Sequence, residues 1–161
     1  MEPSKHIGEL ITAFNRVLTV LNEATKAGRL PHVSRVHLWN SIVSHVLERF
    51  TEAYSQVKTC SVPGRGLMSL DVGSLMSHLM KVGPTNALLL AHDKPHVDAY
   101  VGAYYLESEA DVMQWIHRHK HAYPYRQMEA LVQHGIALKM RKKTAVVELL
   151  AAVRALYLLP T

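Results

Sequence analysis

The chain has 161 residues, of which 48% are hydrophobic and 19% charged, and its formal net charge is +5. This composition supports one ordinary folded core and excludes collagen-like repeats, low-complexity tracts and intrinsic disorder. Cys60 is the single cysteine and no charged-then-apolar leader opens the chain, so we expect a reducing, cytoplasmic compartment. No apolar run approaches the roughly 20 residues that a membrane-spanning helix needs.

The first two predicted elements are long helices. Between residues 4 and 27, apolar side chains recur every three or four positions, as one helical face requires, and Gly28 can end the helix. A second such pattern follows Pro31 and includes Trp39 and Phe50. Because the link between the two patterns is short, we expect an antiparallel pair.

A third helix is predicted after a break. Residues 61–64 contain proline and glycine and interrupt the apolar pattern, which resumes over 67–82. Asp71 and Gly73 lie inside that stretch and predict a joint within the helix.

The segment after this helix is the expected internal seam. Residues 85–94 are bounded by prolines, and we interpret them as a loop with at most one packed helical turn. The prediction is a single α-helical domain over residues 1–161, with sub-bundles at 1–83 and 95–161.

Shorter helices are expected in the remaining chain, at residues 96–106, 108–119, 125–138 and 142–158. Ser108 and the acids after it resemble a capping box, and Pro124 can precede a helix because its missing N–H does no harm there. No alternation typical of strands appears. We therefore predict an all-α antiparallel bundle of about seven helices, two long and five shorter.

Three histidines alternate with two cations at residues 117–121. Imidazoles are good ligands for transition metals, but helical residues two positions apart point in nearly opposite directions, and the cations between them would repel a metal ion. We expect a solvated helix end, or contact with an anion or partner, and no metal or cofactor.

No convincing catalytic set is present. Cys60 lacks the local signature of a thiol nucleophile and is interpreted as a small, buried apolar side chain. The sequence Gly64-Arg65-Gly66 lacks the length and the Lys-Ser/Thr ending of a phosphate-binding loop, so it is interpreted as a helix start. The sequence thus predicts a protein that is not an enzyme.

Basic residues are concentrated near the C-terminus. Between residues 117 and 143 there are seven Lys or Arg against the single acid Glu129. These seven are the candidate contacts for a partner or an anionic lipid: Arg118, Lys120, Arg126, Lys139, Arg141, Lys142 and Lys143. The alternative is a solvated polar turn between two helices. No nucleic-acid-binding module surrounds them, and we expect no nucleic-acid partner.

Tyr100, Tyr104 and Tyr105 lie among aliphatic residues at helical spacing. Aromatic pairs of this kind are more typical of core packing than of a ligand site, so all three are predicted to be core residues.

Two ordered stretches resemble a known family. The first is Tyr54 with VKTCS at 57–61 and GRGLMSLD at 64–71, and the second is VDAYVGAYYL at 97–106. Further matching positions are Trp115, Ile116, His119, Tyr123, Gln127, Leu131, Val132, Lys142, Lys143 and 149–152. In this order they resemble the C-terminal region of the syndetin family, the subunits that distinguish the endosome-associated recycling protein complex from the Golgi-associated retrograde protein complex.

The resemblance implies a helical-rod domain from the C-terminus of a longer, non-catalytic subunit of a vesicle-tethering complex. It further implies endocytic recycling and endosome-to-Golgi retrograde transport, with contacts to other tethering subunits, SNAREs or small GTPases. Such a subunit would lie peripherally on recycling endosomes and trans-Golgi network membranes. The alternative function is a peripheral membrane module that binds anionic lipid through the basic residues.

Overall fold

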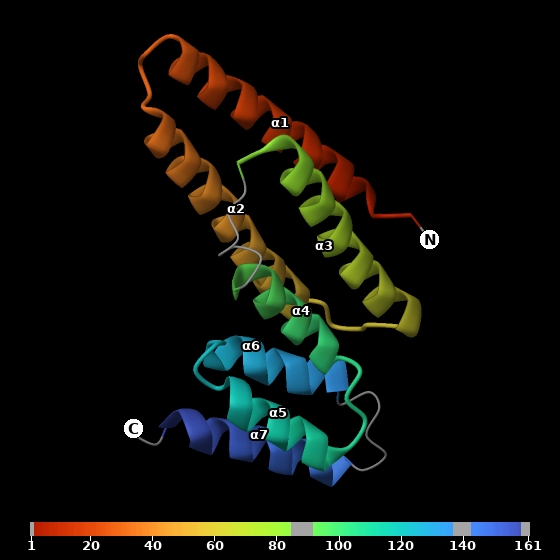
Figure 1. Ribbon diagram of the computed structural model, residues 1–161. Helices are drawn as coiled ribbons and strands as arrows, with labels where there is room; N and C mark the ends of the chain where they lie inside the picture. Colours follow the sequence, from red (N-terminus) through yellow and green to blue (C-terminus); the bar gives the residue numbers. More distant parts are fainter. Residues whose placement is uncertain (1, 85–91, 137–142, 159–161) are drawn as a thin grey trace. The chain divides into compact units, whose positions relative to one another are not determined.

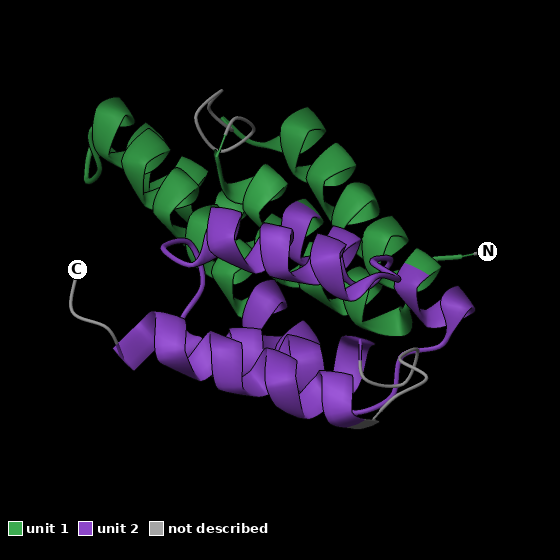
Figure 2. Cartoon of the chain, turned by 90° about the horizontal axis from the view of Figure 1, so that it is seen from below, with its two compact units in different colours: residues 1–49, 66–98 green, residues 50–65, 99–161 purple. Residues whose placement is uncertain are grey.

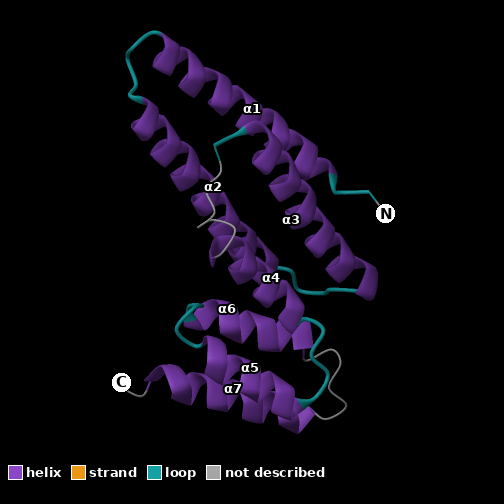
Figure 3. Cartoon of the chain, in the orientation of Figure 1, coloured by secondary structure: helices purple, strands orange, loops and turns teal. Residues whose placement is uncertain are grey.

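The computed structural model describes residues 2–84, 92–136 and 143–158, and every regular element in these ranges is helical (Figure 3). The elements in chain order are α1 (Lys5–Lys26), α2 (His32–Ser55), α3 (Val62–Val82), α4 (Lys94–Ala103), α5 (Glu109–His119), α6 (Tyr125–Ala130), the π-helical segment η2 (Leu131–Ile136) and α7 (Lys143–Leu158) (Figure 1). The predicted all-α fold with seven helices is confirmed. Residues 85–91, the core of the predicted seam, lie outside the described ranges.

The third helix differs from its prediction. It has 21 residues, so the bundle has three long helices instead of two. Pro63 lies in its first turn, where a missing N–H leaves no hydrogen bond unmade, so the predicted break is the helix start itself. The predicted joint is also wrong, because α3 is continuous through Asp71 and Gly73. Asp71 accepts a hydrogen bond from the Ser4 backbone N–H at 2.7 Å, which ties α3 to the start of α1.

The chain divides into two compact units (Figure 2). Unit 1 contains residues 1–49 and 66–98, and unit 2 contains residues 50–65 and 99–161. The boundaries fall inside α2, α3 and α4. The single domain remains a prediction.

Unit 1 is built on α1 and α2, which run antiparallel as predicted (Figure 1). Phe14 of α1 meets Trp39 of α2 edge to face, with ring centroids 5.6 Å apart, and Trp39 is fully buried. The chain passes close to this indole after α3, since a β-carbon at Gly83 would lie 2.3 Å from the ring. A hydrogen bond joins His78 Nε2 of α3 to Asn15 Oδ1 of α1, with the two atoms 2.9 Å apart. The Trp39 indole therefore contacts α1 and lies close to the backbone that follows α3.

Unit 2 contains the short helices. α7 packs against α5, α6 and η2. The predicted capping of α5 is confirmed, because the Ser108 hydroxyl accepts from the Asp111 N–H at 3.1 Å. The helix predicted over residues 125–138 is present as α6 followed by η2, and only the π-helical form of its second half was not predicted. The buried residues of η2 are Leu131, Val132, Gly135 and Ile136. Gly135 is required there, since a β-carbon would lie 2.8 Å from the Tyr104 ring.

Candidate binding surfaces

A buried arginine joins the elements of unit 2. Arg65 is only 8% exposed, and its Nη1 donates to the Tyr104 carbonyl at 2.7 Å. Its guanidinium also lies 5.0 Å from the centre of the Tyr105 ring. Tyr104 follows the last residue of α4, where backbone carbonyls lack helical partners and a positive charge is favourable. The predicted helix start at Gly64-Arg65 is correct, and Arg65 additionally caps α4.

The tyrosines beside this arginine are mostly structural. Tyr100 and Tyr104 are fully buried, as predicted, and their hydroxyls donate to the carbonyls of Gln127 and Tyr54, both at 2.8 Å. Burial raises the pKa of both phenols, so neither is a source of phenolate at neutral pH. The prediction for Tyr105 is wrong, because this residue is 46% exposed and lies outside the core.

Cys60 is half-buried instead of fully buried, and it forms no disulfide. It lies two residues before α3, beside the exposed residues 61–63.

The histidine run is divided by the helix geometry. His119 packs against Trp115 and Tyr123, with centroid distances of 4.4 and 6.1 Å, whereas His117 and His121 are exposed. Within the residues that the structure describes, no group of three side chains is arranged to hold a metal ion. The run is therefore one aromatic packing residue flanked by two solvent-facing imidazoles.

The seven basic candidates differ in their exposure, and the structure describes only some of them. Arg118 and Arg126 are exposed, and Lys120, which follows α5, is half-buried. No ion pair found among the described residues involves these three. Lys139, Arg141 and Lys142 lie outside the described ranges, and Lys143 is the first residue of α7.

Two hollows were not anticipated from the sequence. One, of about 560 Å³, lies between α6 and the end of α7 and is lined by Tyr125, Glu129, Arg154, Tyr157 and Leu158. Tyr125 donates to Glu129 at 2.8 Å there and meets Tyr157 edge to face. The other, of about 540 Å³, follows the small side chains of one α3 face. The first depends on the packing of α6 against α7, which no local sequence pattern specifies.

A membrane-spanning element is absent from the described part of the chain, where no helix combines sufficient length with sufficient apolar character. The described helices instead present polar and charged side chains between their apolar faces.

Comparison with known proteins identifies the family. A family model described as "Syndetin, C-terminal" matches residues 1–153. Syndetin of Mus musculus and of Rattus norvegicus are each 33% identical over 148 residues, and syndetin of Gallus gallus is 32% identical over the same length. The matches cover 92% of this chain but 15% of each relative. No solved structure matches the chain significantly. The chain, all-helical and matched along nearly its whole length, therefore belongs to the syndetin family and represents its C-terminal domain.

Proposed function

We propose that the chain is a non-catalytic interaction domain of a vesicle-tethering subunit that acts in endocytic recycling and endosome-to-Golgi retrograde transport. The observation that carries this proposal is the match of residues 1–153 to the syndetin C-terminal family model. The fold supports it, because long helices with exposed faces offer extended surfaces for other helices.

The proposed partners are other subunits of the tethering complex, together with SNAREs or small GTPases. The proposed location is the cytoplasmic side of recycling endosomes and trans-Golgi network membranes, where the chain is held peripherally. An interaction domain of this kind needs no cofactor, and its specificity comes from the side chains that its helices expose.

A domain exchange tests the proposal. In cells lacking syndetin, the C-terminal domain of mouse syndetin is replaced by this chain within the full-length protein. Intact full-length mouse syndetin and the protein truncated before the domain serve as controls. We expect the chimera to restore the return of an endocytosed receptor to the cell surface and to co-purify with the other tethering subunits. A folded, correctly expressed chimera that behaves like the truncation would overturn the proposal.

The second candidate is direct binding of anionic lipid. The exposure of Arg118 and Arg126 on unit 2 favours it, since each cation near an anionic leaflet contributes about 1 kcal/mol. Flotation of the chain with phosphatidylserine-containing vesicles and with pure phosphatidylcholine vesicles tests it. We expect salt-sensitive binding to the first and none to the second, and equal flotation with both would exclude this candidate.

A further inference from the structure

Two apolar rows run along α1, each with the alternating spacing of three and four residues that is typical of helix-packing seams. The first row is buried or half-buried in unit 1 and contains Ile7, Ile11, Phe14, Leu18 and Leu21. The second row, here called the outer row, contains Leu10, Ala13, Val17, Val20 and Ala24. One helix thus carries two packing seams.

The outer row is only partly covered. Val20 is 63% exposed and Ala13 is also exposed, while the remaining three members are half-buried. Asn15, which bonds to α3, and Val20 are five residues apart and therefore lie about 140° apart around the helix. The side of α1 that carries Val20 consequently points away from α3.

The composition of the outer row suits a helix better than a small ligand. Alanines at two positions allow another helix backbone to approach closely, and the aliphatic side chains between them can enter its grooves. The row extends over two heptads of a 22-residue helix, so a partner helix could follow it for several turns.

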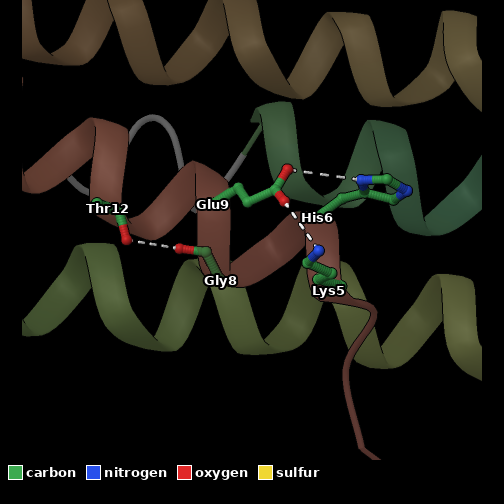
Figure 4. A network of polar contacts seen from close by, with 5 residues as sticks. All are labelled: Lys5, His6, Gly8, Glu9 and Thr12. Atoms are coloured by element: carbon green, nitrogen blue, oxygen red, sulfur yellow. Dashed lines mark hydrogen bonds and ion pairs between the residues drawn. The ribbon is translucent and has the colours of Figure 1, made fainter.

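Charges beside the outer row specify the chemistry of its partner. Glu9, Arg16 and Glu23 are exposed, are spaced one heptad apart and flank the same edge of the row. Glu9 is paired with Lys5 at 4.0 Å and with His6 at 3.8 Å, within its own helix (Figure 4). These side chains are mostly exposed, so the pairs contribute little and can be exchanged for a cation from a partner.

The order of Glu9, Arg16 and Glu23 along α1 determines which charge pattern a partner needs. A partner helix with a basic, an acidic and a basic residue at heptad spacing would be complementary along the whole edge. In an antiparallel, in-register pair of two copies, Arg16 would meet Arg16, and Glu9 would meet Glu23. On this edge the acids Glu9 and Glu23 offset the bases Lys5 and Arg16, so an anionic lipid surface would meet no net positive charge. Both of these alternatives are therefore disfavoured by the charge pattern.

We infer that the outer row of α1 docks an amphipathic helix of a partner protein, one that carries aliphatic residues at heptad spacing beside a basic, acidic, basic series. This inference rests on the proposed function and deepens it by assigning the surface and the chemistry of the bound segment.

The probe is a fluorescently labelled synthetic helix of three heptads with leucine and valine at the seam positions. It carries lysine, glutamate and lysine at the positions that face Glu9, Arg16 and Glu23, and a second peptide has these three charges reversed. Fluorescence anisotropy with the full 161-residue chain should give saturable binding of the first peptide and weaker binding of the second.

Two variants of the chain provide a matched comparison. Val20→Asp should weaken binding of the first peptide by about tenfold or more, because it places a charge in the seam. Val33→Asp, at an equally exposed valine on α2, should leave it unchanged. Thermal melts should show both variants folded. Arg16→Glu should weaken binding of the first peptide, whose glutamate faces position 16. A peptide with lysine at that facing position should restore binding to this variant.

Any of three results would overturn the inference. These are no saturable binding of the first peptide, an equal loss of binding in the two aspartate variants, or failure of the lysine peptide to restore binding to Arg16→Glu. A chain that dimerises through the outer row, detected by sedimentation and abolished by Val20→Asp, would assign the row to a second copy instead. The full-length chimera carrying Val20→Asp separates the two proposals. If it still co-purifies with tethering subunits, the outer row is not the docking surface and the proposed function stands.

Discussion

The two units use different means to build a core. Unit 1 has long helices whose interior is almost entirely apolar and centres on Trp39, which is fully buried against Phe14. Unit 2 has mostly short helices, and its interior includes the Arg65 guanidinium and the hydroxyls of Tyr100 and Tyr104. Short helices bury less apolar surface and leave more unpaired backbone groups for their length, so side-chain hydrogen bonds must complete the structure.

The largest effect is expected at the indole of unit 1. Trp39→Ala should lower the free energy of unfolding by about 3–5 kcal/mol, because it leaves a cavity that the neighbouring helices cannot fill. Urea denaturation followed by circular dichroism measures this loss. Leu38→Ala, at the neighbouring and 45% exposed position, is the control and should cost far less. Equal losses would show that the apolar core of unit 1 is not centred on Trp39.

A smaller effect is expected at the polar centre of unit 2. Arg65→Met keeps the aliphatic stem but removes the donor to the Tyr104 carbonyl, and should cost about 1–3 kcal/mol by leaving a buried acceptor unpaired. The same denaturation experiment measures it, with the exposed Arg118→Met as control. An unchanged or higher stability would mean that burying the charge costs as much as its hydrogen bond contributes.

The free energy of unfolding should also depend on pH, through a half-buried histidine of unit 1. Burial, and secondarily the charge of His92, lowers the pKa of His96 below its ordinary value of 6.5, although Asp93 and Glu48 oppose the shift. The unfolded chain therefore binds a proton more readily than the folded chain as the pH falls through 6.5. Stability should be highest above this pH and should decrease below it.

Unfolding free energies measured between about pH 7.5 and pH 5.5 test this direction. His96→Gln should make the pH dependence shallower, whereas His37→Gln, at an exposed position of α2, should not. A steeper loss of stability in His96→Gln would contradict the assignment.

The smallest change in stability is expected on the surface of unit 2. Reversing Arg118 and Arg126 to glutamate should alter the free energy of unfolding by less than about 0.5 kcal/mol, as exposed substitutions usually do. If these cations contact anionic lipid, the same variant should bind phosphatidylserine vesicles more weakly and with less salt dependence. Unchanged binding with an intact fold would move attention to the exposed acids Glu107, Glu109 and Asp111.

Much of unit 1 was predictable because long helices repeat their pattern many times. The apolar spacing placed α1 within one residue at each end, and Gly28, with φ of +68°, ends the helix as expected. The pattern also contained the outer row, but sequence alone did not separate the row that is packed in unit 1 from the row that is only partly covered. Periodicity identifies apolar faces, whereas the packing of α2 and α3 decides which face of α1 is covered.

Unit 2 was less predictable because its key interactions join residues far apart in the chain. The sequence identified the Ser108 cap, a local interaction across three residues. It did not reveal that Arg65 caps α4 across 39 residues, nor that Tyr105 lies outside the core while Tyr104 lies inside it. Neighbouring tyrosines on one turn have the same local pattern, and only the packing around them decides which one is buried.

The amino-acid sequence by itself determined the helical class, the helix count and the family, since these depend on local periodicity and on ordered motifs. The tertiary structure alone decided that α3 runs unbroken through Gly73, that Gly135 packs against Tyr104, and that the outer row of α1 is only partly covered. Each of these outcomes depends on the space left between helices, and that space is set by side chains that are distant in the sequence.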